Sequence, residues 1–372
     1  MINLDSFTGA EHRNICSKIE MNVWRKCDQY LLPEMKPQTN PGIYDIYPSF
    51  KLGENQIFTG FESLAELFLN HRQIVIDGYV GVFFDHFREK TDEYLRTRGI
   101  RTSWQNTSDY LKHPDVITEM ISSFMGGDDP VFGFRTTLNL DDFFEPELSS
   151  AKPEEDAEVN FIIGPGASLA GWKGLLIYLD LPKNEIQFRS RAGSISNLGA
   201  KEPFDPKAMY KRFYFVDWVV LNKHKKKLLP LTDIIVDAQN RENPEWMKGD
   251  RLRHSLSEMS HNVFRVRPWF EPGVWGGTWI MNHIYGLNNK VPNYAWSFEL
   301  IVPENGLLFE SSGKLLEVSV DWLMYQESKE ILGECYSRFG TDFPIRFDFL
   351  DTFDGGNLSL QCHPRLYEKT FR

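Results

Sequence analysis

The chain has 372 residues, a length that favours two domains because single domains seldom exceed about 250 residues. Apolar residues at 41% and charged residues at 25% are typical of globular proteins, and the net charge of −11 argues against nucleic acid as a partner. The four cysteines form no Cys-x-x-Cys pair, and there is neither a basic-then-apolar leader nor an apolar run of about 18 residues. The sequence therefore predicts a cytoplasmic protein that has no membrane partner.

The spacing of apolar residues predicts the elements of an α/β fold in the first two thirds of the chain. Residues 1–43 are expected to form an N-terminal helix and a turn-rich linker. The elements expected next are helices over 60–70 and 83–98 and buried strands over 73–78, 159–163, 175–179 and 234–236. A strand, a glycine turn and a helix begin a βαβ unit, so residues 44–245 are predicted to form an α/β domain with a parallel sheet.

Polar and charged residues crowd together over 239–258, and this segment is predicted to be a boundary. After it, residues 263–372 are predicted to form a β-rich second domain, with strands over 345–350 and 358–362 and a helical hairpin around 315–332. The basic stretch Lys223–Lys227 is predicted to be solvated surface.

The junction after the strand over 73–78 aligns with the phosphate-loop pattern G-x-x-x-x-G-K-[ST]. Gly78 matches the first glycine, but Phe83, Phe84 and Asp85 stand where the second glycine, the lysine and the hydroxyl residue belong. Phe83 fills the room that the loop backbone needs, Phe84 removes the cation, and Asp85 adds a negative charge at an anion site. The sequence therefore predicts neither ATP binding nor phosphoryl transfer here.

Residues 44–240 nevertheless resemble the nucleoside-kinase branch of P-loop kinases. Arg189 and Arg191 stand where lid arginines would be. The strands that carry the resemblance are Ile74–Gly78, Phe161–Gly166, Leu176–Pro182 and Thr232–Asp237. The resemblance implies a degenerate, non-catalytic kinase-like domain, a pseudokinase. The alternative is an unrelated doubly wound α/β domain, since buried strands of this kind occur in all α/β folds.

Near the C-terminus, Ser359, Gln361 and His363 alternate with Leu358, Leu360 and Cys362. In a strand this alternation sends the three polar side chains to one face, where an imidazole and an amide oxygen suit a divalent ion such as zinc.

Four ordered motifs after residue 264 resemble class I mannose-6-phosphate isomerases. They are Pro268–Gly277 with its Trp-Gly-Gly, Tyr294–Gly306 with its glutamate, Phe343–Asp351, and Asn357–Pro364 with its Leu-Ser-x-Gln-x-His-Pro. In the third motif Asp348 stands where that family has a lysine, which leaves the role of this position open. The resemblance implies a cupin β-barrel with one zinc ion, which interconverts mannose 6-phosphate and fructose 6-phosphate.

The same resemblance assigns roles to individual residues. Gln361 and His363 would be two of four zinc ligands, Ser359 would lie near the substrate phosphate, and Trp275 and Glu299 would shape the pocket wall. The family's other two ligands lie downstream of these motifs, so residues 263–372 are expected to be a partial, truncated cupin domain of doubtful activity. The residues do not identify the general base.

Two functions therefore remain open. The first is a zinc-dependent aldose-ketose isomerase of carbohydrate metabolism that acts on a hexose 6-phosphate. The second is a non-catalytic nucleotide- or sugar-sensing protein built on the pseudokinase domain. A third function, an active nucleoside kinase, is not predicted because Phe84 and Asp85 replace the lysine and the hydroxyl residue of the phosphate loop.

Overall fold

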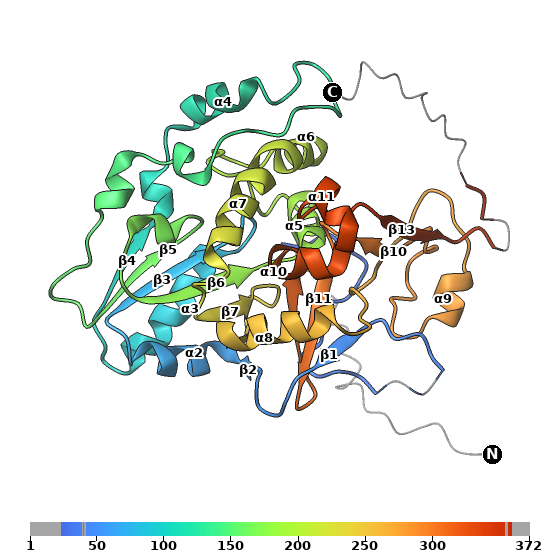
Figure 1. Cartoon of the computed structure of the whole chain (residues 1–372), viewed down its shortest axis with the longest axis horizontal. Coiled ribbons are helices and arrows are strands. Elements are labelled where there is room, and N and C mark those ends of the chain that lie inside the picture. Colours follow the sequence, from blue (N-terminus) through green and yellow to red (C-terminus); the bar gives the residue numbers. More distant parts are fainter. Residues whose placement is uncertain (1–23, 39, 41, 354–355, 359–372) are drawn as a thin grey trace, which may run out of the picture.

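The computed structural model describes residues 24–38, 40, 42–353 and 356–358, and Figure 1 shows their arrangement. The fold is a mixed α/β fold built around one large sheet, as the sequence predicts. Within the described ranges, no helix is long and apolar enough to cross a membrane.

The large sheet has seven strands, of which five are parallel. In spatial order they are β2 (Phe58–Thr59), β8 (Glu245–Lys248), β7 (Ile234–Asp237), β6 (Leu175–Asp180), β3 (Gln73–Gly78), β5 (Val159–Ile163) and β4 (Thr102–Asn106). Strands β7, β6, β3, β5 and β4 run parallel, and β8 and β2 add an antiparallel edge. Residues of β5 and β6 are buried throughout, which explains their continuous apolar sequences. Strand β3, the first of the parallel strands along the chain, lies at the centre of the five parallel strands.

Helices cover both faces of this sheet, with α7 above and α2 and α3 below in the view of Figure 1. The helices are α2 (Gly60–Phe68), α3 (Phe84–Thr97), α4 (Pro114–Ser122), α5 (Lys183–Arg191), α6 (Pro206–Arg212), α7 (Trp218–Leu228), α8 (Gly249–Ser260), α9 (Trp279–His283), α10 (Asp321–Leu332) and α11 (Tyr336–Phe339). A π-helical turn over Phe213–Asp217 joins α6 to α7. The start of α6 is fixed by Pro206 at its first position and by the Asp205 carboxylate, which accepts the N–H of Ala208.

Two three-stranded sheets complete the fold. One contains β1 (Ser49–Lys51), β11 (Gly306–Ser311) and β12 (Lys314–Ser319), and the other contains β9 (Trp269–Glu271), β10 (Trp296–Ile301) and β13 (Arg346–Leu350). The predicted helical hairpin around 315–332 is wrong in its first half, which is strand β12. Ser312 and Gly313 both have positive φ and close a tight β11–β12 turn that fixes this pairing. The second half is helix α10, as predicted.

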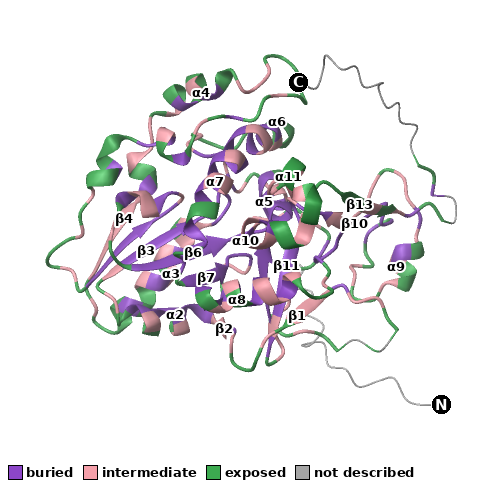
Figure 2. Ribbon diagram, viewed as in Figure 1, coloured by how far each residue is buried: buried purple, intermediate pink, exposed green. Residues whose placement is uncertain are grey.

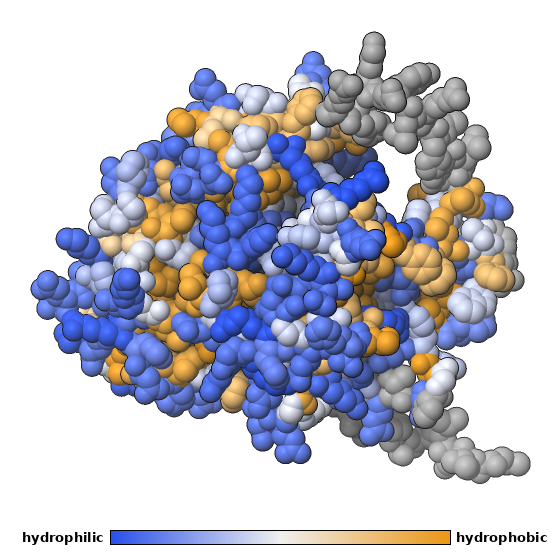
Figure 3. Space-filling view, in the orientation of Figure 1, coloured by the Kyte–Doolittle hydropathy of each residue, from blue (hydrophilic) through white to orange (hydrophobic). Residues whose placement is uncertain are grey.

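The main hydrophobic core extends from the large sheet into the segment beyond residue 300. Tyr178 of β6, for example, meets Trp322 of α10 edge to face at 5.0 Å between ring centroids. Figure 2 shows the buried residues gathered in the central strands, while hydrophilic residues cover most of the face seen in Figure 3. The segment over 239–258, predicted as a boundary, contains β8, which pairs in the large sheet, and helix α8. The described strands after residue 263 form open sheets and not a closed barrel.

Candidate functional site

The loop between β3 and α3 takes the place that a phosphate loop would occupy. Two of its backbone N–H groups, those of Gly78 and Tyr79, are paired within the chain. The N–H of Gly78 donates to the Asp77 carboxylate at 2.7 Å, and that of Tyr79 donates to the carbonyl of Leu179 at 3.2 Å. Gly81 has a φ of +94°, which lets the loop turn tightly here. These two N–H groups are therefore not available to a phosphate oxygen, which a phosphate loop binds through free backbone amides.

Arg189 of α5 fills the space beside this loop. Its guanidinium is fully buried and donates to the carbonyls of Gly81 at 2.8 Å, Ala238 at 2.9 Å and Gln239 at 3.1 Å. It also lies 4.4 Å from the ring centroid of Phe83. Burial lowers the pKa of Arg189 to about 10, although the neighbouring Glu185 carboxylate opposes this shift. The prediction that Arg189 is a lid arginine is wrong, because its side chain is locked inside the fold.

The two positions that replace the phosphate-loop lysine and hydroxyl are also accounted for. The ring of Phe84 lies against the start of the loop, where a Cβ added at Gly78 would meet its Cζ at 3.1 Å. The Asp85 carboxylate is exposed and lies 3.8 Å from Arg88. Neither side chain supplies the cation or the hydroxyl group that a phosphate loop uses at these positions.

A cavity of ≈ 540 Å³ opens beside this junction, at the carboxyl ends of β3, β4 and β5. Ligands of open α/β sheets bind at this edge, where loops diverge from the strand ends. The cavity is lined by the loop after β3, by Asn106–Ser108, by Gly164 and Pro165, and by residues 194–199. We call it the carboxyl-edge pocket.

The carboxyl-edge pocket presents unpaired polar groups. The side chains of Asn106, Thr107, Ser108 and Ser196 make no hydrogen bond to any other described residue. Charged groups of both signs also line it, namely Asp85, Lys201, Glu202 and Arg241. Hydroxyl and amide groups without protein partners are available to a polar ligand, whereas the balanced charge gives little attraction for a polyphosphate.

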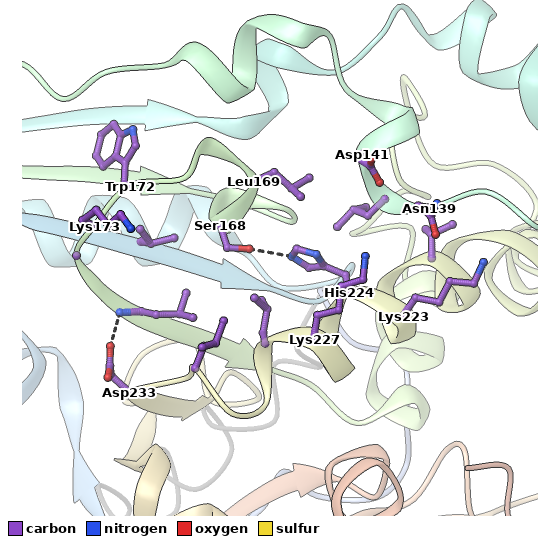
Figure 4. Close-up of a pocket in the computed structure, with 17 residues that line it drawn as sticks. Asn139, Asp141, Ser168, Leu169, Trp172, Lys173, Lys223, His224, Lys227 and Asp233 are labelled. Atoms are coloured by element: carbon purple, nitrogen blue, oxygen red, sulfur yellow. Dashed lines mark hydrogen bonds between the residues drawn. The ribbon is translucent and has the colours of Figure 1, made fainter. Parts of the chain in front are cut away.

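Asp77 and His224 are buried and form a cluster behind the loop with the half-buried Ser168; Figure 4 shows Ser168 and His224. Nε2 of His224 lies 2.9 Å from Asp77 Oδ2 and 3.1 Å from Ser168 Oγ. A catalytic triad needs these two groups on opposite ring nitrogens, so this arrangement cannot relay a proton from the serine. Burial raises the pKa of Asp77, but His224 and the N–H of Ser168 outweigh it and the pKa is lowered. The cluster therefore has a structural role, in which its hydrogen bonds connect β3, the segment after β5 and α7.

Two residues predicted to shape an isomerase pocket wall lie on the β9–β10–β13 sheet. Trp275 packs edge to face on Trp296 at 5.1 Å between ring centroids. Glu299 accepts hydrogen bonds from Ser297 and from the Tyr44 hydroxyl, the latter at 2.6 Å. The register of β10 shifts at Glu299, whose carboxylate meets the Ser297 hydroxyl, whereas Trp275 packs on Trp296. The structure therefore does not bring Trp275 and Glu299 together in one wall.

The other predicted site residues, Ser359, Gln361 and His363, lie outside the described residues. Within the part that the structure describes, no group of three or more His, Cys, Asp or Glu side chains could hold a metal ion. Zinc therefore remains a prediction from the sequence, and no chemical step is derived through it.

The basic stretch Lys223–Lys227 is not the solvated surface predicted from the sequence, because it is part of α7 and two of its residues are buried. Lys225 is fully buried and lies 2.5 Å from Asp180 Oδ1, at the carboxyl end of β6. Its ammonium also faces the rings of Tyr79 and Trp322, each 5.0 Å away. One signal was present in the sequence, since Leu221, Lys225 and Leu228 share one helical face.

Three buried carboxylates meet near the carboxyl end of β7. Burial and the charge of Glu317 raise the pKa of Asp237 to about 7, although N–H groups of Glu317 and Gln239 lower it. Burial and the charge of Asp237 raise the pKa of Glu245 to about 9. Arg267 pairs with Glu317 at 2.5 Å. Asp237 therefore shares this site with one cation and two other acids.

This cluster predicts that stability falls as the pH rises. A carboxyl group with a raised pKa in the folded state stabilises the fold below its unfolded pKa of about 4, and this contribution is lost as the pH rises through about 7. The free energy of unfolding of the unchanged protein should fall between pH 5 and pH 8. In Asp237→Asn this fall should be smaller by about 2 kcal/mol. Urea unfolding at both pH values checks this, with exposed Asp250→Asn as the control. An unchanged pH dependence in Asp237→Asn would contradict the assignment.

The fold and the junction define the class of protein. It is an α/β protein with a mostly parallel sheet, whose strand–glycine turn–helix junction is filled by the chain's own side chains. The chain belongs to the family described as "Domain of unknown function (DUF8485)", whose sequence model matches residues 60–261, more than half of the chain. A comparison with curated proteins found no match.

Proposed function

We propose that this protein is a ligand-sensing protein whose α/β part is a kinase-like domain that does not transfer phosphoryl groups. The observation that carries the proposal is the buried Arg189, which binds the Gly81 carbonyl in the loop after β3. A phosphate loop uses free backbone N–H groups and a lysine at this position, whereas here the N–H groups of Gly78 and Tyr79 are paired and Phe84 replaces the lysine. The kinase-like assignment is supported by the central position of β3 and by the strand–loop–helix order of β3 and α3.

The binding part of the proposal is supported by the carboxyl-edge pocket. It lies at the strand ends where α/β proteins bind ligands, and its volume of ≈ 540 Å³ suits a small molecule. Its unpaired hydroxyl and amide groups favour a ligand rich in hydroxyl groups, either a nucleoside or a sugar.

Isothermal titration with adenosine, mannose 6-phosphate and MgATP tests the proposal. We expect adenosine or mannose 6-phosphate to bind, and MgATP to give no binding at millimolar concentration. Thr107→Val with Ser196→Ala should weaken the binding about thirtyfold, because each of the two neutral hydrogen bonds contributes about 1 kcal/mol. Exposed Ser149→Ala serves as the control. Magnesium-dependent ATP binding would overturn the kinase part, and no binding of either other probe would overturn the sensing part.

A second candidate is a mannose-6-phosphate isomerase-like unit in residues 263–372. The specific observation that favours it is that three of the four isomerase-like motifs form one sheet. Strand β9 from the first motif and β13 from the third both pair antiparallel with β10 from the second, so that Trp296 lies opposite Glu271 and Leu350. The N–H of Gly277 also donates to the carbonyl of Asp351 at 2.7 Å. Motifs that act together are expected to lie together in this way.

Zinc enters the second candidate through the sequence resemblance at Gln361 and His363. Zinc content and the conversion of mannose 6-phosphate to fructose 6-phosphate are measured for the unchanged protein and for His363→Ala. We expect zinc in the first and a loss of zinc in the second, while exposed His283→Ala keeps it. Equal zinc content in the unchanged protein and in His363→Ala, or zinc in neither, would refute this candidate.

A further inference from the structure

A second cavity lies on the α7 side of the large sheet and shares no lining residue with the carboxyl-edge pocket. Its volume is ≈ 680 Å³, within the range of about 300–1,000 Å³ typical of small-molecule sites. Gly174 and Asp233, which line it, precede β6 and β7, so this cavity lies toward the amino ends of those strands. We call it the α7 cavity.

The interior of the α7 cavity is largely apolar. Val75 of β3 and Leu176 of β6 contribute from the sheet, and Val220 and Leu228 contribute from α7. Leu140, Leu169 and Leu231 add to this lining. The apolar body of a ligand that covers these side chains is stabilised by the hydrophobic effect.

Three lysines lie around this apolar lining without acidic partners. Figure 4 shows Lys223 and Lys227 projecting from α7 on one side of the cavity, and Lys173 on the other. Among the described residues, none of the three ammonium groups lies within 4.0 Å of a carboxylate oxygen. The Lys223 ammonium is held in place by the carbonyls of Leu138 at 2.8 Å and Thr137 at 3.3 Å, which leave its charge uncompensated.

Two acids also line the α7 cavity but do not cancel this charge. Asp233 accepts the N–H of Leu176 at 2.8 Å, and Asp141 lies on a short 3-10 helix over Leu140–Phe143. The three lysines therefore outnumber the two acids around the cavity, although the chain as a whole is acidic, with a net charge of −11. His224 adds a polar group, held rigid through Nε2 by Asp77 and Ser168.

We propose that the α7 cavity binds a small amphipathic anion. The apolar chain or ring of the ligand lies against the leucine-rich lining, and its carboxylate or phosphate group lies at Lys223 and Lys227. Both parts of the ligand are required, because the apolar lining gives a free anion no contact area and the lysines give a neutral chain no charge partner. This site is independent of the function proposed for the carboxyl-edge pocket.

Calorimetric titration of the unchanged protein with octanoate, 1-octanol and inorganic phosphate tests both requirements. We expect octanoate to bind, 1-octanol to bind at least tenfold more weakly, and phosphate to give no binding at millimolar concentration. Octanol binding as tight as octanoate would overturn the role of the lysines. Phosphate binding as tight as octanoate would overturn the role of the apolar lining. If octanoate does not bind, the proposal that the α7 cavity is a binding site is wrong.

Lysine substitutions locate the site. Lys223→Gln combined with Lys227→Gln should weaken octanoate binding five- to tenfold, and the loss should shrink at high salt because the interaction is electrostatic. Lys226→Gln, on the same helix but outside the cavity, is the matched control and should bind as the unchanged protein does. The single Lys227→Gln variant gives the same test if the double variant does not fold. Octanoate binding that these substitutions leave unchanged would overturn the assignment.

Discussion

Arg189→Met is expected to lower the free energy of unfolding by about 3–5 kcal/mol, the range found when one partner of a buried charged pair is removed. The substitution leaves Glu185 with one cation fewer and removes the donors that serve the carbonyls of Gly81, Ala238 and Gln239. Buried acceptors without donors are costly, and methionine fills the volume but supplies none. Urea unfolding followed by tryptophan fluorescence measures the change.

The matched control for this prediction lies two residues further along α5. Arg191 pairs with Glu271 at 2.8 Å, but its side chain is 40% exposed. Arg191→Met should therefore cost less than about 1 kcal/mol, as surface ion pairs do. Equal effects at the two positions would mean that Arg189 does not hold the loop after β3 in place.

Lys225→Met should destabilise the protein by a similar amount, about 3–5 kcal/mol. Lys225 is the buried cation closest to Asp180. Without it, the Asp180 carboxylate keeps the hydrogen bond from the N–H of Ser319 but has lost this cation. Combining Lys225→Met with Asp180→Asn should recover part of the loss, because the buried charge that lost its partner is then removed as well.

Lys226→Met provides the comparison for Lys225, since Lys226 is exposed on the same helix and should change stability by less than about 0.5 kcal/mol. The double variant carries the decisive measurement. If Lys225→Met with Asp180→Asn is no more stable than Lys225→Met alone, then Asp180 is not the partner that makes Lys225 necessary.

Four of the seven strands of the large sheet were predictable because they are short, mostly apolar runs, whereas the short β2 and the more polar β4 and β8 were not predicted. Strands β3 and β5 match their predicted bounds, and β6 and β7 extend theirs by one residue. Such runs are buried on both faces in parallel sheets, so local sequence is sufficient to find them. By contrast, β12 has the sequence Lys-Leu-Leu-Glu-Val-Ser, which has no clear period, and only its turn with β11 selects the strand.

The way in which side chains fill the junction between β3 and α3 was predictable only in part. The chemistry of Phe84 and Asp85 alone predicts that no nucleotide phosphate binds there. The role of Arg189 was not predictable, because its partners come from three separate segments that include Gly81 and Ala238. Buried charge depends on partners that are distant in sequence, whereas apolar burial shows in the local pattern.

Strand β12 also bears on where the family match ends. The N–H of Ser319 donates to Asp180 at 2.7 Å, and that of Glu317 donates to Asp237 at 2.9 Å. These carboxylates stand at the ends of β6 and β7, inside residues 60–261, but their donors lie beyond residue 261. A relative that shares only the matched segment has to supply these donors from unrelated sequence. The matched segment therefore ends inside a single folded unit, because strand β12 supplies donors to two of its buried carboxylates.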